Sequence, residues 1–269
     1  MTTAPHPQQP VSRDLARPDR AMVIAAHPDD AEFCAGATLA KWGSLGTAIT
    51  HVVLTDGSKG TWDASVDQRE LIAQRQTEQR AAAQVLTDTS HVEFLGYTDG
   101  DLAYMDTVES FALRKSLARL IRVHRPQVVF AHDPWKQYRL HPDHERAGWI
   151  AIQGIVAARD PFFHPELLNE GLQPHRPQAL LLFEANAVTH VESVQIEAAH
   201  KKVDALLEHV SQLETTHFHR VQQEHGNDDA GLEDTKQAFR DRELRLLQAT
   251  GGLYGVEFAE GFSLIDDQL

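Results

Sequence analysis

Short apolar segments alternate with amphipathic stretches along most of this chain. Five segments are mostly apolar, at residues 23–26, 48–54, 92–95, 128–131 and 179–183. Short apolar segments without a clear period are typical of strands in a parallel sheet that is covered on both faces. The pattern therefore predicts a set of buried strands.

Helical periodicity separates these segments. Apolar residues recur three or four positions apart after residue 32, over 68–86, over 111–121 and from 141 to 158. Strand and helix patterns thus alternate at least four times. This alternation predicts an α/β fold with a mostly parallel sheet and helices on both faces.

The C-terminal third is predicted to be an elaboration of this sheet. We expect a helix over 191–213, a polar loop over 222–231, a helix over 232–249 and an edge strand over 258–265. No repeat or linker divides the 269 residues, which predicts a single domain over 21–269. Residues 1–20, rich in proline and polar groups, are expected to form a flexible tail.

Composition limits the cellular location and the binding partners that the sequence predicts. Acidic residues outnumber basic residues 39 to 25, for a net charge of −14, which argues against nonspecific binding to nucleic acid or to an anionic membrane. Cys34 is the single cysteine, so no intramolecular disulfide can form and a reducing compartment is favoured. Without a membrane-length apolar run or a secretory signal pattern, the chain is expected to be soluble and cytoplasmic. The sequence allows a homo-oligomer but does not predict one.

Two clusters of polar residues follow predicted strands. The sequence His-Pro-Asp-Asp occupies 27–30, directly after the first apolar segment, and His-Pro-Asp-His occupies 141–144. Pro28 and Pro142 each suit the first position of a helix, where a missing N–H costs nothing. Because parallel strands end at the same edge of a sheet, we expect the two clusters to lie together at that edge.

The side chains of these clusters suit a catalytic metal. Histidine and carboxylate are common ligands of catalytic zinc, which keeps one position open for water. His27 and Asp30 flank a stiff turn, and His141 and His144 lie three positions apart near one helix face. Asp29 is directed elsewhere and stays available as a base. Iron could replace zinc in such a set of ligands.

The two clusters together resemble the LmbE-like (PIG-L) family of zinc-dependent N-deacetylases. The resemblance rests on 26–32 and 141–144, with supporting segments at 75–78, 95–100 and 209–212, in family order over nearly the whole chain. It implies a Rossmann-like α/β fold. It also implies that His27, Asp30 and His144 bind zinc, and that Asp29 is the general base.

The resemblance further implies roles for the second cluster. His141 would assist the tetrahedral intermediate, and Asp143 would orient or charge His141. The chemistry fits these roles: zinc lowers the pKa of its bound water towards about 7, so Asp29 can take the proton. Zinc and a protonated His141 would then stabilise the oxyanion. Either Asp29 or His141 could protonate the leaving amine.

Four further residues are candidates for substrate binding. Arg75 and Asp99 resemble family positions that hold sugar hydroxyl groups, although either could also be a surface or turn residue. Tyr138 and Arg139 precede the second cluster. In the mycothiol-pathway branch a tyrosine stands two residues before the leading histidine, where this chain has Arg139. This departure argues against assigning the chain to that branch.

We therefore expect a zinc-dependent hydrolase that removes an N-acetyl group from an amino sugar or glycoconjugate. An amidase for a larger amide, such as a thiol conjugate, is the nearest alternative. A nucleotide-binding or sugar-binding module without catalysis is a second one, disfavoured because the turn at 27–32 contains no glycine. A metal-free interaction protein is a third, disfavoured because every matched ligand position is occupied.

Overall fold

The computed structural model describes residues 11–137, 140–213, 229–266 and 269. Within these ranges eight strands form one sheet, in the order β1-β7-β8-β6-β5-β2-β3-β4. The strands are β1 (Ser12–Arg13), β2 (Arg20–Ala25), β3 (Ala48–Thr55), β4 (Ser90–Tyr97), β5 (Val128–His132), β6 (Ala179–Phe183), β7 (His190–Val194) and β8 (Phe258–Ile265). The five strands from β6 to β4 are parallel, whereas β8 is antiparallel to both its neighbours. The mostly parallel sheet confirms the predicted fold class.

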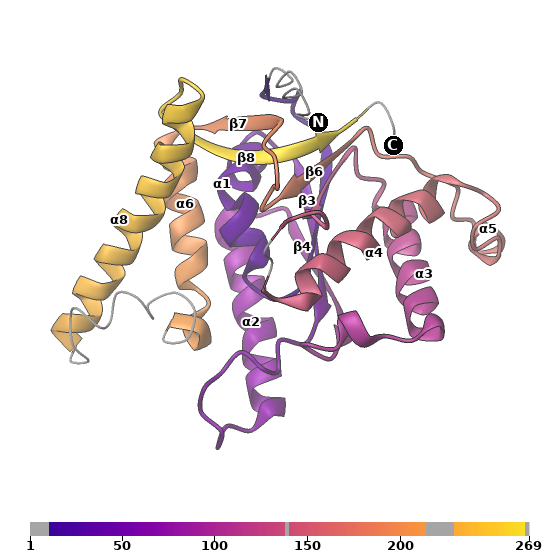
Figure 1. The fold of residues 1–269 in the computed structure, drawn as a ribbon, viewed down its shortest axis with the longest axis horizontal. Coiled ribbons are helices and arrows are strands. Elements are labelled where there is room, and N and C mark those ends of the chain that lie inside the picture. The colour runs from indigo at the N-terminus through magenta and orange to yellow at the C-terminus, as the bar shows by residue number, and fades with distance from the viewer. Residues whose placement is uncertain (1–10, 138–139, 214–228, 267–268) are drawn as a thin grey trace, which may run out of the picture.

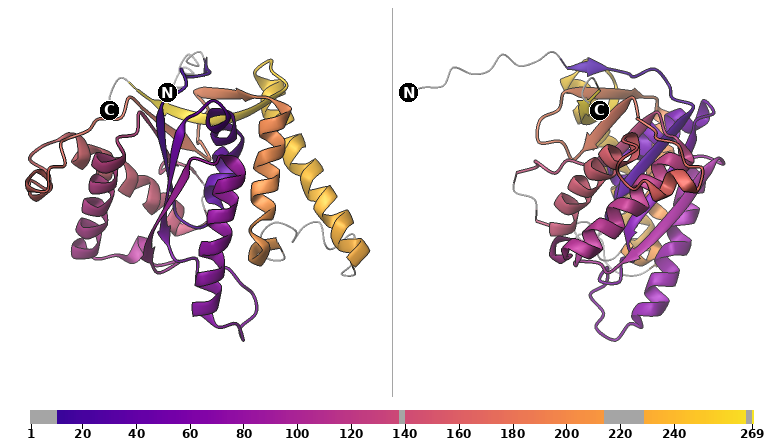
Figure 2. Two further views of the ribbon diagram at one scale, coloured as in Figure 1. Left: turned by 180° about the vertical axis from the view of Figure 1, so that it is seen from behind. Right: turned by 90° about the vertical axis from the view of Figure 1, so that its right-hand side faces the viewer.

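Helices cover both faces of the sheet. The described helices are α1 (Asp30–Ser44), α2 (Gln68–Leu86), α3 (Thr107–His124), α4 (Pro142–Arg159), α5 (Glu166–Asn169), α6 (Ile196–Leu207) and α8 (Asp229–Leu253), with 3-10 turns η1 (Leu102–Tyr104) and η2 (Val210–Gln212). Figures 1 and 2 show α1, α2, α6 and α8 on one side of the sheet and α3, α4 and α5 on the other. No helix in the described part of the chain has the length and apolarity needed to cross a membrane.

The central strand β2 is buried on both faces. Val23 packs in the core on the α1 side, together with Trp42, while Met22 and Ile24 pack on the α3 and α4 side with Leu117. Each such fully buried apolar side chain contributes about 1.5–3 kcal/mol to stability. The turn that follows β2 is therefore anchored on a rigid strand.

The order of the strands reverses at β2. This strand pairs with β3 on one side and with β5 on the other, so the chain connections leave it in opposite directions. Ligands of open α/β sheets bind outside the carboxyl ends of the strands at such a reversal. His27 follows β2 and His132 ends β5, so both histidines lie at this position.

The predicted edge strand at 258–265 is an interior strand. β8 lies between β6 and β7, with Leu264 paired to Leu181 and Gly261 paired to Val191. The prediction was wrong because the strands that pair with β8 on its two sides, β6 and β7, are distant in sequence. Glu260 is buried, since its Oε1 accepts a hydrogen bond from Lys202 Nζ of α6 at 2.7 Å.

The predicted helix over 191–213 begins later than expected. His190–Val194 is strand β7, and α6 spans Ile196–Leu207. The polar residues His190 and Glu192 are buried in β7 because they contact each other at 2.9 Å, and Glu192 also accepts a hydrogen bond from Lys41 at 2.9 Å. Lys41 lies 151 positions from Glu192, so the local pattern did not reveal the strand.

Two other expectations are corrected at the ends of segments. Ser12 and Arg13, expected in a flexible tail, form β1 and pair with β7. Residues 229–231, expected in a polar loop, begin α8. Residues 1–10 and the rest of the predicted loop, 222–228, lie outside the described residues.

Candidate active site

The turn between β2 and α1 is held in a rare backbone conformation. α1 begins at Asp30, so the prediction that Pro28 is its first residue is wrong. Asp29 has φ of 93°, in the left-handed region that residues with a Cβ rarely adopt. Two bonds to α2 hold the turn: Arg75 Nη2 donates to the Pro28 carbonyl oxygen at 2.8 Å, and the Asp29 N–H donates to Gln79 Oε1 at 2.9 Å. α2 therefore maintains a conformation that by itself costs about 1–3 kcal/mol.

A buried polar network lies behind this turn. Gln79 Nε2 donates to Glu32 Oε1 at 2.8 Å, and the other oxygen of Glu32 lies 3.5 Å from His209 Nε2. Burial raises the pKa of Glu32, but the hydrogen bond and charge of His209 outweigh burial and hold the pKa below its usual value. Gln79 thus connects an ionised carboxylate to the backbone of Asp29.

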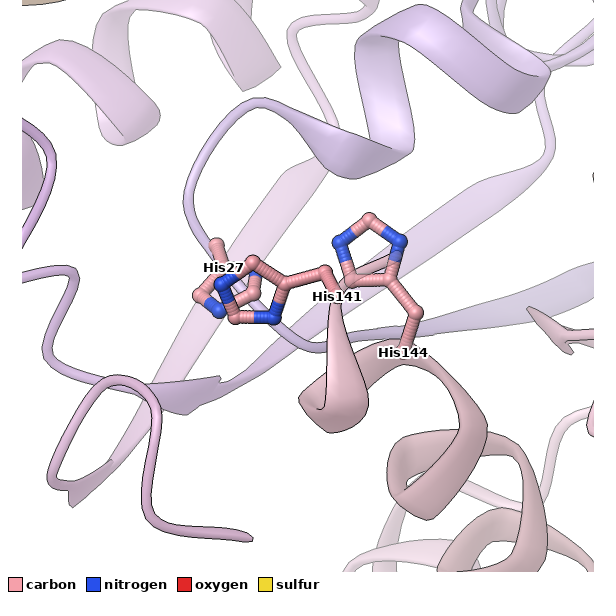
Figure 3. Close-up of side chains that lie close together, drawn as sticks. All are labelled: His27, His141 and His144. Atoms are coloured by element: carbon pink, nitrogen blue, oxygen red, sulfur yellow. The ribbon is translucent and has the colours of Figure 1, made fainter. Parts of the chain in front are cut away.

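The three predicted metal ligands converge at the reversal of strand order. Asp30 Oδ2 lies 3.4 Å from His27 Nδ1, and Asp30 Oδ1 lies 3.3 Å from His144 Nε2. The rings of His27 and His144 are 5.2 Å apart between centroids. Figure 3 shows both rings beside that of His141, with His141 and His144 at the start of α4. The structure brings the three together; that they bind a metal stays a prediction.

Several overlapping groups of side chains here could bind a cation. Three groups hold their donor atoms within 4.8 Å of one another, namely His27 with His141 and His144, Asp30 with His132 and His144, and His27 with Asp99, His141 and Asp143. The predicted trio draws one or two members from each group. The whole cluster, rather than one isolated set of three ligands, is therefore rich in metal-binding atoms.

His132 and Glu184 support the predicted ligands. His132 Nε2 lies 3.2 Å from Asp30 Oδ2, and its Nδ1 lies 2.9 Å from Glu184 Oε2. Glu184 also lies 3.3 Å from His144 Nδ1. The two residues thus link Asp30 to His144 by a second route, as residues around metal ligands commonly do.

Asp99 and Asp143 surround His27 on its other side. His27 Nε2 lies 3.1 Å from Asp99 Oδ1 and 3.2 Å from Asp143 Oδ2. Backbone N–H groups fix Asp143, because Gly100 donates to Oδ2 at 2.6 Å and Leu102 donates to Oδ1 at 3.0 Å. The carboxylate of Asp143 therefore contacts His27 rather than accepting a hydrogen bond from His141 among the described contacts. Its predicted role toward His141 stays a prediction.

The site concentrates negative charge. Four buried carboxylates and one more exposed carboxylate gather in it: Asp29, Asp30, Asp99, Asp143 and Glu184. Among the described lysines and arginines, Arg75 approaches one of these carboxylates, with Nη2 3.7 Å from Asp29 Oδ2. Buried charges are stable only when they are paired or coordinate a metal. This excess of carboxylates fits a cation in the site.

The opposite charges of the histidines and carboxylates in the site shift the pKa values of both. Burial lowers the pKa of His27, but hydrogen bonds to Asp143, Asp30 and Asp99 outweigh burial and raise the pKa well above its usual value. Burial raises the pKa of Asp30, but the positive charges of His144 and His132 outweigh burial and place the pKa well below its usual value. The site therefore favours positive charge between these ligands.

Asp29 differs from the other carboxylates. Burial raises the pKa of Asp29 to about 6, against the charges of Arg75 and His209, which lower it. Its carboxylate lines the same cavity as His27 and His144. A carboxyl group that titrates near neutral pH can both accept and return a proton.

His141 stands at the mouth of the site. Its Nδ1 accepts a hydrogen bond from the Asp143 N–H at 3.4 Å and caps α4, whose first residue is Pro142 as predicted. Its Nε2 lies 3.9 Å from Asp99 Oδ1. Burial lowers the pKa of His141, and the charges of His27 and His144 lower it further. Because Nδ1 accepts a hydrogen bond, Nε2 is the nitrogen that carries the proton in the neutral ring.

A cavity of about 620 Å³ opens beside these residues. Arg75 and Asp99 line it, as expected of substrate-binding residues. Arg75 is only 3% exposed, however, and its Nη1 also donates to the Gly57 carbonyl oxygen at 2.8 Å. Arg75 thus supports two loops, and its contact with substrate stays a prediction. The other two candidates, Tyr138 and Arg139, lie outside the described residues.

Sequence reasoning missed three residues of this site. His132 and Glu184 come at or directly after the ends of β5 and β6, so the rule that singled out His27 could also have found them. Gln79 lies in the middle of α2, and no local signal distinguishes it from the exposed glutamines of the same helix.

Comparison with known proteins decides the family. A family model described as PIG-L, GlcNAc-PI de-N-acetylase, matches residues 22–155. The diacetylchitobiose deacetylase of Thermococcus kodakarensis is 32% identical over 194 residues, which cover 72% of this chain and 70% of that protein. The chain belongs to the PIG-L family. The resemblance seen in the sequence is thereby confirmed.

Similarity to two further deacetylases agrees with this family. The 1D-myo-inositol 2-acetamido-2-deoxy-alpha-D-glucopyranoside deacetylase of Streptomyces scabiei is 30% identical over 185 residues, which cover 62% of this chain and 56% of that protein. The solved structure of N,N'-diacetylchitobiose deacetylase from Pyrococcus horikoshii, in complex with an inhibitor, has a TM-score of 0.76 and 27% identity. The match covers 93% of this chain and 84% of that chain. This PIG-L chain thus shares sequence and fold with proteins named as deacetylases.

Proposed function

We propose that this PIG-L protein is a zinc-dependent hydrolase that removes the N-acetyl group of an amino sugar or glycoconjugate. The N-deacetylase class follows from the family and from the deacetylases similar to this chain. The observation that carries the proposal is the meeting of His27, Asp30 and His144 on the wall of a cavity that Asp29 also lines.

The donor set and the charge of the site fit a divalent cation. His27, Asp30 and His144 would hold it, with Asp30 fixed by His132. A cation there would supply Lewis-acid polarisation of the amide carbonyl and acidify a water molecule. Zinc is the proposed ion because imidazole and carboxylate are its usual catalytic ligands; iron remains a candidate on ligand type.

Three residues of the protein would supply proton transfer, oxyanion stabilisation and positioning. Asp29 faces the cavity with a carboxylate that can take a proton from water and return it to the leaving amine. His141 can donate a hydrogen bond from Nε2 to the developing oxyanion, whether its ring is neutral or protonated. Asp143 holds His27 and lies in the first turn of α4, so it sets the relative positions of the two clusters.

The cavity supports a sugar substrate. Its volume of about 620 Å³ lies in the usual range for small-molecule sites. Trp62, which is 66% exposed, offers an apolar face on its rim, and Asp99 and Arg75 offer polar groups within it. The relatives named as diacetylchitobiose and inositol-glycoside deacetylases make N-acetylglucosamine compounds the first substrates to test.

The alternatives gain less support. For a nucleotide-binding module, Gly36 is the nearest glycine after β2, but it lies inside α1, where a Cβ would come within 3.0 Å of Lys202. An amidase for a larger amide uses the same groups and would be distinguished by substrate. A cytoplasmic location stays a prediction from the sequence.

A substrate screen tests the proposal. Protein with its metal restored is incubated with N-acetylglucosamine, N,N'-diacetylchitobiose and a larger thiol-conjugate amide, and released primary amine is measured. We expect release from an acetylated sugar, loss of release in His144→Ala, and no change in the matched control His200→Ala, which alters an exposed histidine of α6. Release only from the larger amide would favour the amidase, and equal release in wild type and His144→Ala would overturn the proposed site.

A further inference from the structure

A second group of metal-ligating side chains lies away from the active site. His91 and Glu93 of β4 and His124 of α3 hold one donor atom each within 4.8 Å of one another. Glu93 Oε1 lies 2.7 Å from His91 Nε2 and 3.9 Å from His124 Nε2. His124 follows Glu93 by 31 positions, so no local pattern connects the three residues. The fold brings them together.

Rigid elements present all three side chains. His91 and Glu93 are two positions apart on one strand, so both point to the same face of the sheet. Leu95 and Tyr97 continue this face and pack against the core that includes α3. His124 is the last residue of α3, and the Arg125 N–H that follows donates to the Ile121 carbonyl oxygen at 2.9 Å. The cluster is therefore not built on a loose loop.

We propose that His91, Glu93 and His124 form a second binding site for a divalent transition metal such as Zn²⁺. Two imidazoles and one carboxylate are a known zinc ligand set that leaves a fourth position for water. Tetrahedral zinc with bonds of about 2.0–2.1 Å places its ligand atoms about 3.3 Å apart. The observed separations of 2.7 and 3.9 Å lie on either side of this value, so small side-chain rotations complete the geometry.

The site is open to an ion from solvent. The side chains of His91, Glu93 and His124 are 56%, 36% and 23% exposed. His91 and His124 line a hollow of about 250 Å³, which Arg20 and Thr89 also line. Arg20 Nε is held by the Arg125 carbonyl oxygen at 3.1 Å, so the guanidinium has a partner other than Glu93.

This site is separate from the active site. His91 is the second residue of β4, whereas Asp99 of the active site follows the carboxyl end of the same strand. The six residue steps of strand from His91 to Tyr97 span about 20 Å at 3.3 Å per residue. Metal at His91 would join the edge strand β4 to the end of α3. The inference does not depend on the proposed deacetylase activity.

Metal stoichiometry tests the inference. Apo protein is titrated with Zn²⁺, and bound metal is measured by equilibrium dialysis with elemental analysis. We expect His91→Ala/His124→Ala to bind one equivalent less than wild type, and the control His200→Ala to bind as much as wild type. Equal stoichiometry in wild type and the double variant would overturn the inference, whatever the active site binds.

Two further measurements distinguish the loss of a metal ligand from misfolding of the variant. Glu93→Gln keeps the size of the side chain and should weaken this site at least tenfold, with circular dichroism unchanged. In His27→Ala/His144→Ala, which removes predicted active-site ligands, Cu²⁺ should give an electron paramagnetic resonance spectrum with coupling to two nitrogen nuclei that is lost when His91→Ala/His124→Ala is added. Unchanged affinity in Glu93→Gln, or a spectrum without nitrogen coupling, would contradict the proposed ligands.

Discussion

Replacing Gln79 by leucine should damage both the stability and the activity of this protein. The side chain is 1% exposed and makes two hydrogen bonds, accepting from the Asp29 N–H at 2.9 Å and donating to Glu32 at 2.8 Å. Leucine has a similar volume, so the change removes polar contacts and creates little cavity. The effect therefore reports on the bridge between Glu32 and the turn that carries Asp29.

The expected loss of stability follows from the two groups that lose their hydrogen bond to Gln79, the Asp29 N–H and the Glu32 carboxylate. A buried polar group that loses its hydrogen bond costs about 1–3 kcal/mol, so the two together predict a loss of about 2–6 kcal/mol in the free energy of unfolding. Asp29 also loses a bond that holds its left-handed backbone. A displacement of about 1 Å of a catalytic group can lower turnover about 100-fold. We expect kcat to fall by that order while bound metal stays unchanged.

Urea unfolding and amine release measure the two effects. The matched control is Gln74→Leu, on the same helix, which removes an exposed side chain that donates to Glu78 at 2.8 Å. Glu78 is buried but keeps two hydrogen bonds from Ser211, so the control should cost less, about 0.5–1.5 kcal/mol. In a double-mutant cycle, Glu32→Leu and Gln79→Leu should be non-additive by about 0.5–3 kcal/mol. The reasoning is refuted if Gln79→Leu unfolds and turns over like Gln74→Leu.

Two other predictions concern the buried ion pair of Lys202 with Glu260 and the residue His132 beside the predicted metal ligands. Burial lowers the pKa of Lys202, but the charge of Glu260 and the hydrogen bond between the two side chains raise this pKa above 10.5. The stability that the pair contributes is therefore fully present below that pH, and it is lost as the pH rises through the pKa of the folded state. Lys202→Met should cost about 3–5 kcal/mol at pH 8, and urea unfolding should show this difference shrinking above about pH 10.5; a constant difference would contradict the pairing. His132→Gln should weaken metal binding about 10–100-fold, because His132 contacts Asp30 at 3.2 Å, and unchanged affinity by competition with a chelator would remove this supporting role.

The sequence predicts the parts of this fold that depend on local pattern. The helix expected over 68–86 has those bounds as α2, because its apolar residues repeat at helical spacing and Asp67 caps its start. The strand expected over 179–183 has those bounds as β6, since it is apolar throughout. The convergence of His27 with His144 also followed from local reasoning, because parallel strands share one carboxyl edge.

The parts that were missed depend on partners distant in sequence. β7 contains Glu192, whose burial is explained by Lys41, 151 positions away. β8 is an interior strand because it pairs with β6 and β7, and its buried Glu260 has its partner, Lys202, on α6. Gln79 gains its importance only from Asp29 and Glu32, 50 and 47 positions away. No local pattern of apolar and polar residues encodes such contacts.

The most direct test of the account is the Asp29→Asn variant, measured for both metal content and deacetylation of an N-acetylated sugar. Asparagine keeps the size of the side chain and tolerates the left-handed backbone at this position. If the metal is held by His27, Asp30 and His144 while Asp29 moves the proton, the variant should keep its metal and lose about 10²–10⁴-fold in kcat. Turnover close to that of wild type, or loss of the metal together with turnover, would contradict this division of roles.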